Sequence, residues 1–147
     1  MSFGSELKAF AKKTGGKLED VAREVVLNVG RSVVEKSPVG DASYWKNPPP
    51  PGYVGGRFRA NWQHGFGSPA SGALDAIDPS GGVSIAHIQS GVGGNPAAGV
   101  HFISNNLPYA EEIENGHSKR QAPRGVVGLT AIEFKDIVSI SVQKAKQ

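Results

Sequence analysis

The chain has two charged ends and a middle rich in glycine and proline, and this division limits the folds it can adopt. Residues 1–36 carry seven basic and five acidic side chains, and residues 110–147 carry six and five. Residues 37–109 carry only three of each. Charged residues that leave an apolar stripe are typical of amphipathic helices, whereas glycine and proline favour turns and extended backbone. We therefore expect helices at both ends, with extended segments and loops between them.

The two end regions repeat apolar residues at helical spacing. Over residues 17–36 these are Leu18, Val21, Ala22, Val25, Val29 and Val33. Over residues 126–145 they are Val127, Ala131, Phe134, Val138 and Ser141. The first helix must end near Ser37, because Pro38 disfavours helical backbone in the residue before it. Residues 5–13 also suit a helix, with an apolar side of Leu7, Phe10 and Ala11.

The middle of the chain contains two predicted strands. Residues 57–66 alternate, with Phe58, Ala60, Trp62 and Phe66 on one face. This pattern makes them the clearest strand, and residues 99–104 form a shorter one. Residues 80–92 fit either a strand or a helix, because the periodicity there matches both.

Length and composition exclude several classes of protein. A chain of 147 residues is expected to form one domain with its own core. It has no cysteine, which excludes disulfides and thiolate chemistry. No apolar run is long enough for a signal peptide or a membrane span. The formal net charge of +3 is too mild to indicate a nucleic-acid-binding protein.

Residues 38–56 contain four consecutive prolines, Pro48 to Pro51. Such a run favours polyproline II, which is extended and has no internal hydrogen bonds. The segment is either a surface loop or an arm that reaches a neighbouring subunit. The composition favours the surface loop. The argument for the arm is that Tyr44, Trp45 and Tyr53 flank the prolines, because exposed apolar surface usually marks a contact.

Catalytic and metal-binding patterns are not evident. The glycines at residues 91–94 lack the lysine and serine or threonine of a phosphate loop. The histidines His64, His87, His101 and His117 show no metal-ligand spacing, and His64 is expected to be buried and hydrogen-bonded. The carboxylates Glu111, Glu112 and Glu114 are expected to form a solvated acidic turn. We therefore expect no catalytic residues, no cofactor and no metal.

Two basic stretches could contact phosphates. One is Arg57-Phe58-Arg59 and the other runs from Lys119 to Arg124. Arginine beside aromatic residues suits single-stranded nucleic acid. Nearby glutamates offset much of this charge, so a small nucleic-acid-binding module is the alternative hypothesis and not the favoured one.

Two blocks of sequence carry a resemblance to a known family. The first is Ser37-Pro38-Val39 together with Gly55-Gly56-Arg57-Phe58-Arg59-Ala60-Asn61-Trp62-Gln63, although here residues 40–54 separate the two parts. The second runs from Asn105 to Gly125, through a turn, a short amphipathic helix and a basic loop, and continues with Thr130 and Glu133-Phe134. In these blocks the chain resembles the neck proteins of tailed bacteriophages, which complete the tail and join it to the head.

The resemblance implies an α+β fold, with a small, mostly antiparallel sheet packed by N-terminal and C-terminal helices, and it favours a helix over residues 80–92. It also implies a structural virion protein without enzymatic activity, assembled in the host cytoplasm. Its expected partners are copies of itself in a ring, a tail terminator or tail tube protein, and the head–tail connector, with non-specific contact to passing DNA.

The physics of the second block suits docking, because Pro108 and Tyr109 make a rigid turn with an exposed ring and Pro123 stiffens the basic loop. The residues we expect to bind partners are Tyr53, Arg57, Arg59, Asn106, Pro108, Tyr109, Glu112, Lys119, Arg120 and Arg124.

Overall fold

The structure is a computed structural model that describes residues 5, 8–9, 12 and 18–145. Its elements in chain order are helix α2 (Leu18–Lys36), the 3-10 turn η1 (Ala42–Tyr44), helix α3 (Arg57–Ala60), strand β1 (Trp62–Phe66), helix α4 (Gly82–Gly93), strand β2 (His101–Asn105) and helices α5 (Ala110–Glu114), α6 (Val127–Ile132) and α7 (Phe134–Ala145).

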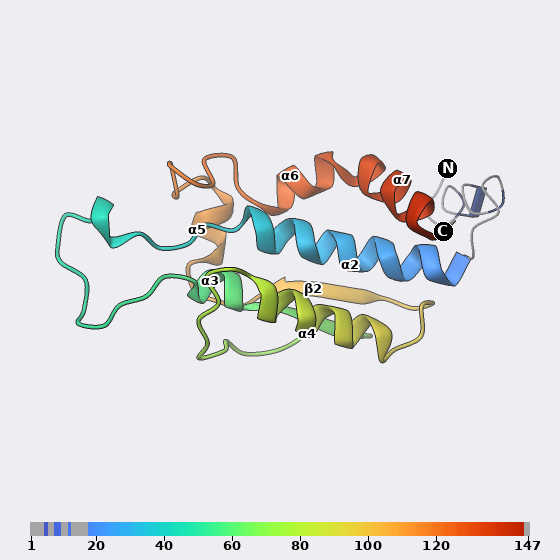
Figure 1. Cartoon of the computed structure of the whole chain (residues 1–147), viewed down its shortest axis with the longest axis horizontal. Coiled ribbons are helices and arrows are strands. Elements are labelled where there is room, and N and C mark those ends of the chain that lie inside the picture. The colour runs from blue at the N-terminus through green and yellow to red at the C-terminus, as the bar shows by residue number, and fades with distance from the viewer. Residues whose placement is uncertain (1–4, 6–7, 10–11, 13–17, 146–147) are drawn as a thin grey trace.

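Helices surround a two-stranded antiparallel sheet, which confirms the expected α+β class. Trp62 pairs with Asn105 at one end of the ladder and Phe66 with His101 at the other. Helix α2 runs the length of the molecule between α6 and α7 on one side and the sheet with α4 on the other (Figure 1). The arm projects from one end of this body, beyond α5 (Figure 1).

The core has two parts along α2. The larger joins α2, α3, α4 and strand β1 to buried residues between β2 and α6, and its members include Val34, Phe58, Trp62 and Ile88. The smaller packs the first turns of α2 against α7 through Val21, Val25, Val138 and Val142. The two helical ends of the chain therefore meet on one side of the molecule.

Helix α2 confirms the helix expected over residues 17–36, and it ends where proline requires. The hydroxyl of Ser37 donates to the carbonyl of Val33 (2.6 Å) and accepts a hydrogen bond from the indole of Trp62 (2.6 Å). Ser37 is thereby buried at the point where α2 stops. The end of the helix is thus joined to strand β1 before the chain turns into the arm.

The strand expected over residues 57–66 is only half a strand. Residues 57–60 form the helical turn α3, and Gly56 before them takes a left-handed φ of 117°. The amide of Ala60 donates to the carbonyl of Gly56, which closes the turn. Phe58 and Ala60 are buried in this helical form too, so alternation over four residues did not distinguish the two structures. The second strand was predicted at residues 99–104. The structure has strand β2 there, at His101–Asn105.

The ambiguous segment at residues 80–92 is a helix, α4. The side chain of Asp78 accepts the amide of Ser84 (2.8 Å), and the hydroxyl of Ser80 accepts that of Gly82 (3.2 Å). Because these oxygens take up amides that have no partner inside the helix, they favour helix over strand. Gly30 of α2 lies against Ile88, so the two helices cross closely.

The C-terminal helix is divided, and its inward face differs from the one expected. Helix α6 ends before Glu133 and α7 begins after it. Val127 is half exposed, whereas Thr130 is buried and its hydroxyl lies 2.7 Å from that of Ser32. The change of direction at Glu133 rotates the face of α6 relative to α7, so one continuous periodicity does not describe both.

At the N-terminal end, residues 5, 8–9 and 12 are helical, in agreement with a helix over residues 5–13. The predicted apolar side of that helix and the glycines after it lie outside the described residues. Across the part of the chain that the structure describes, no helix is both long and apolar enough to span a membrane.

Candidate docking groove

The proline-rich segment forms an arm that is pinched at its root. Gly40 and Gly55 face each other there, and a Cβ on Gly55 would collide with the carbonyl oxygen of Gly40. The two legs of the arm can touch only because both residues lack a side chain. The rings of Trp45 and Tyr53 then pack across the stem, with centroids 4.7 Å apart.

Local chemistry fixes the shape of the arm. The carboxylate of Asp41 accepts the amide (3.0 Å) and hydroxyl (2.6 Å) of Ser43, which starts the turn η1. These two hydrogen bonds, the hydroxyl's first, hold the pKa of Asp41 below its usual value. At the tip, Tyr53 donates its amide to Pro50, and Gly52 takes the positive φ of 75° that a type II turn requires.

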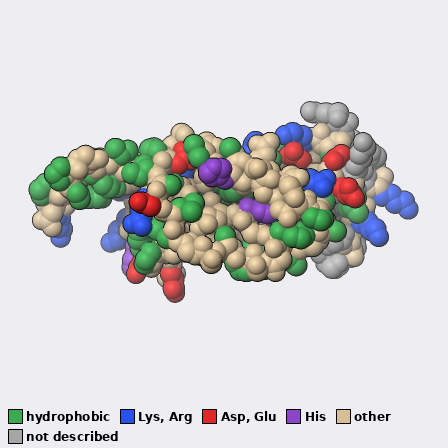
Figure 2. All heavy atoms as spheres, turned by 90° about the horizontal axis from the view of Figure 1, so that it is seen from below, with side chains coloured by type: hydrophobic (Ala, Val, Ile, Leu, Met, Phe, Trp, Pro, Cys, Tyr) green, Lys and Arg blue, Asp and Glu red, His purple; other side chains and the backbone are tan. Residues whose placement is uncertain are grey.

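The outer part of the arm is exposed and apolar. Trp45, Tyr53 and Val54 are 44%, 38% and 54% exposed, and residues 48–51 are exposed as well. Figure 2 shows hydrophobic side chains along the projecting arm. A contiguous exposed apolar surface usually marks an interaction site.

The basic loop after α5 is fixed by Glu114. Its carboxylate accepts the amides of Val126 (2.9 Å), Val127 (2.8 Å) and Gly128 (2.8 Å), and so caps the start of α6. Burial alone would raise the pKa of Glu114, but these three amides together lower it below its usual value. The expected solvated acidic turn is therefore wrong for Glu114, because its partners lie a dozen residues further along the chain.

The arm and the basic loop are joined at their roots. The side-chain amide of Gln121 accepts the backbone N–H of Val39 (2.7 Å) and donates to the carbonyl of Val39 (2.5 Å). It pairs with Val39 as a neighbouring strand would. Between Ser118 and Ala122 a short bridge closes the loop. Both walls of the space between arm and loop are thereby fixed.

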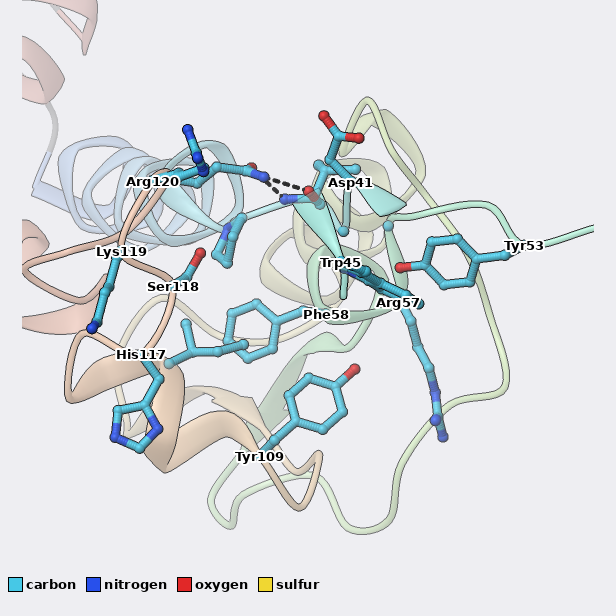
Figure 3. A pocket seen from close by; sticks show the side chains of 16 residues that line it. Asp41, Trp45, Tyr53, Arg57, Phe58, Tyr109, His117, Ser118, Lys119 and Arg120 are labelled. Carbon is cyan, nitrogen blue, oxygen red and sulfur yellow. Dashed lines mark hydrogen bonds between the residues drawn. The ribbon is translucent and has the colours of Figure 1, made fainter. Parts of the chain in front are cut away.

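That space is a groove of about 620 Å³. Phe58 lies at its centre, with Tyr109 on one side and Trp45 on another (Figure 3). Lys119 and Arg57 lie on opposite sides of the groove (Figure 3). The groove thus has an aromatic floor and a cationic rim, assembled from two distant stretches of the chain, residues 38–58 and 109–121.

Five of the ten residues expected to bind partners line this groove. They are Tyr53, Arg57, Tyr109, Lys119 and Arg120. Partial burial raises the pKa of Tyr109. Its hydroxyl is a hydrogen-bond donor at neutral pH, as that of any protonated tyrosine is. Sequence reasoning did not assign Trp45, Phe58 or Gln121 to the site, although the aromatic cluster around the prolines was a signal for Trp45.

Two other expected partner-binding residues, Arg59 and Asn106, lie outside the groove lining and are hydrogen-bonded within the chain. The guanidinium of Arg59 donates to the carbonyls of Pro79 (2.7 Å), Glu35 (3.1 Å) and Ser37 (2.8 Å), which caps the end of α2. The side chain of Asn106 donates to the carbonyls of Ala70 (2.8 Å) and Gly72 (3.1 Å). Both side chains satisfy carbonyl groups of their own chain.

The other three expected residues are exposed but lie outside the groove lining. They are Pro108, Glu112 and Arg124. Pro108 belongs to the turn before α5, which places Tyr109 against Phe58 with ring centroids 6.2 Å apart. The first part of the basic loop, with Lys119 and Arg120, therefore lines the groove, and the part with Arg124 does not.

A pair of histidines joins the two strands away from the groove. Nε2 of His64 lies 2.8 Å from Nδ1 of His101, and Nε2 of His101 lies 3.0 Å from the carbonyl of Pro96. Burial, and then the neighbouring His101, lower the pKa of His64. His64 is hydrogen-bonded, as expected, but only partly buried. The residues that the structure describes contain no group of three or more metal-ligating side chains.

Comparison of the chain with protein-family models, with curated proteins and with solved structures finds no match in any of the three. The geometry of the groove and the arm, with the two sequence blocks above, therefore carries the functional argument.

Proposed function

We propose that this protein is a structural component of a bacteriophage neck, which completes the tail and joins it to the head connector as one subunit of a ring. The observation that carries the proposal is the groove itself. An aromatic floor and a cationic rim lie at the root of an exposed apolar arm, and aromatic and arginine side chains dominate the binding energy of protein interfaces.

The two sequence blocks that resemble neck proteins support the same proposal, because both contribute to this end of the molecule. Arg57 and Phe58 come from the first block, and Tyr109 and Lys119 from the second. Cations on the rim suit an acidic surface on a tail or connector protein, since complementary charge steers encounter and fixes orientation.

We also propose that the protein is not an enzyme. The groove presents donors and rings, and its carboxylate, Asp41, is already bonded to Ser43. Ser43 and Asp41 are a hydroxyl and a carboxylate in contact, but two hydrogen bonds from Ser43 hold the pKa of Asp41 low, which makes it a weak base. The histidines of the two strands, His64 and His101, bond to each other and to a backbone carbonyl, and neither is bonded to a hydroxyl there.

Electron microscopy of lysates from a virus that lacks the gene tests the proposed role. Filled heads beside separate tails would support joining, and tails of abnormal length would support completion of the tail. Normal infectious particles would refute both. A plasmid copy carrying Lys119→Ala with Arg120→Ala should fail to restore particles, whereas one carrying Arg124→Ala, outside the groove, should restore them.

The second candidate is a nucleic-acid-binding module. The specific observation in its favour is that Arg57 and Lys119 flank the exposed rings of Trp45, Tyr53 and Tyr109, on which the bases of a single strand could stack. Such binding depends steeply on salt. Titration of a labelled single-stranded oligonucleotide at low and physiological salt separates the candidates: tight binding at physiological salt would favour the module over the neck protein.

A further inference from the structure

We propose that the groove binds the proline run of a second copy's arm, so that each subunit is joined to the next by an arm seated in a groove. This inference deepens the ring assembly proposed above by naming the contact between subunits. It rests on the complementary chemistry of the groove and the proline run.

The proline run is exposed and does not lie in the groove of its own chain. Pro48, Pro49, Pro50 and Pro51 are exposed, and none of them is among the residues that line the groove. Each of the first three precedes another proline, which restricts its backbone to extended or polyproline II conformations. The run is therefore stiff before it binds, and little ordering entropy opposes its docking.

A polyproline segment has an unusual hydrogen-bonding character. Proline has a carbonyl but no backbone N–H, so the run offers acceptors and apolar rings and no donors. A complementary site must supply aromatic surface for the rings and donors for the carbonyls. Aromatic-lined grooves that bind proline-rich segments recur among peptide-recognition domains.

The groove has this complementary character. Trp45, Phe58 and Tyr109 provide rings, and the guanidinium of Arg57, the ammonium of Lys119 and the hydroxyl of Tyr109 are donors. Its carboxylate acceptor, Asp41, already receives two hydrogen bonds from Ser43. With several cationic side chains and a single carboxylate, the side chains that line the groove offer more hydrogen-bond donors than acceptors.

Size also agrees. A polyproline segment rises about 3.1 Å per residue, so four residues span roughly 12 Å. The groove volume of about 620 Å³ lies within the range of roughly 300–1,000 Å³ typical of ligand pockets. A run of three or four prolines can therefore lie along it.

The geometry of the arm favours a neighbour's groove over its own. The arm is pinched at Gly40 and Gly55, and the contact between Trp45 and Tyr53 closes its stem. The same two rings line the groove, so the tip would have to fold back over its own stem to enter. The tip instead extends away from the body (Figure 1). A contact between two different surfaces of identical copies produces a ring when its rotation closes.

The first test is a titration of the protein with a synthetic peptide of residues 46–54, followed by NMR. Backbone signals of Tyr109, Lys119 and Gln121 should shift, and a peptide with serine in place of the prolines should leave them unchanged. Arg57→Ala with Tyr109→Ala should weaken peptide binding at least about tenfold, which is about 1.4 kcal/mol. Arg124→Ala is the matched control from the same basic loop and should bind as the wild type does.

The second test is complementation between two full-length variants in analytical ultracentrifugation. The arm variant carries serine at positions 48, 49 and 50, and the groove variant carries Arg57→Ala with Tyr109→Ala. The wild type should associate as its concentration rises, and each variant alone should remain monomeric. An equimolar mixture should form dimers and nothing larger, because it contains one intact arm and one intact groove per pair.

Several results would overturn the inference. One is a peptide that causes no shifts in the groove at millimolar concentration, and another is two variants that associate as the wild type does. A wild type that binds the peptide but stays monomeric would place the arm in its own groove. These solution results do not depend on any virus, so the failure of the inference and the failure of the neck proposal can be told apart.

Discussion

At the scale of single residues, two arginines two positions apart have different tasks. Arg59 bonds three carbonyls of its own chain, whereas Arg57 is exposed on the rim of the groove. The sequence could not separate them, because the partners of Arg59 come from Glu35, Ser37 and Pro79, and their proximity is set by the fold. Residue type predicted the chemistry of both side chains, and burial decided which one is available to a partner.

This difference gives a matched pair of substitutions. Arg59→Ala should lower the free energy of unfolding by about 2 kcal/mol, because it leaves carbonyls at the end of α2 without their charged donor. Arg57→Ala should change it by less than about 0.5 kcal/mol, as expected for a surface residue. Urea denaturation of both variants measures the contrast, and equal losses would contradict the assigned roles.

Glu114 provides a second prediction at this scale. Glu114→Gln should destabilise the protein by about 1 kcal/mol at pH 7, since the charged cap of α6 is lost. The pKa of Glu114 is lowered in the folded state, so its contribution is complete above its ordinary value of 4.5 and is lost as the pH falls through the folded value. The difference in the free energy of unfolding between Glu114→Gln and the wild type should therefore become smaller in acid.

Denaturation curves at pH 7 and at pH 3 measure that difference. Glu112→Gln is the control, because this neighbouring carboxylate is exposed. A difference for Glu114→Gln that stays the same at both pH values would show that the substitution acts through packing and not through charge.

At the scale of elements, apolar periodicity predicted long helices better than short ones. Helix α2 spans more than five turns, so its buried stripe repeats often enough to exclude a strand. In α3, which has four residues, helix and strand bury the same alternate side chains Phe58 and Ala60. The turn forms there because side chains satisfy its carbonyl groups: the distant Asn105 donates to the carbonyl of Phe58 (2.9 Å), and the neighbouring Asn61 donates to that of Arg57 (2.8 Å).

The sequence predicted several of the residues that line the groove but not that they lie together, because a contact between distant residues brings them together. The groove residues were identified as two separate basic and aromatic stretches, and half of the expected residues line it. What joins the stretches is the pairing of Gln121 with Val39 across 82 positions of the chain. A side chain that substitutes for a strand leaves no periodic signal, so the sequence could not show that the stretches meet.

The crossing of α2 and α4 gives a prediction for packing between elements. A Cβ at Gly30 would lie 2.8 Å from Cγ2 of Ile88, which is fully buried. Gly30→Ala should gain about 1 kcal/mol of helix propensity but lose about 1–3 kcal/mol to overpacking, for a net loss of about 1 kcal/mol. Thermal or urea denaturation measures it.

The control is the same substitution in a background of Ile88→Ala, where the methyl groups that oppose the new Cβ are absent. There, Gly30→Ala should be neutral or stabilising, because space is free and propensity remains. A loss of the same size in both backgrounds would show that the distance to Ile88 is not the cause.

At the scale of the whole molecule, the arm is separable from the body that carries it. Replacing residues 41–54 by a two-residue glycine linker should not lower the free energy of unfolding and should raise it by up to about 2 kcal/mol, because Gly40 and Gly55 already touch and a shorter loop closes at lower entropic cost. Association between copies should be lost. Circular dichroism and ultracentrifugation of this variant measure both properties, and loss of folding would mean that the arm supports the body.

The long axis of the molecule also has two unlike ends. The arm and groove lie at one end, whereas α2 begins at Leu18 and α7 finishes at Ala145 near the opposite end (Figure 1). An affinity tag or a fluorescent fusion attached after α7 would therefore point away from the docking surface. Molecules anchored by such a tag to a sensor chip would all present arm and groove to the solution, which makes single-orientation binding measurements practical for this chain.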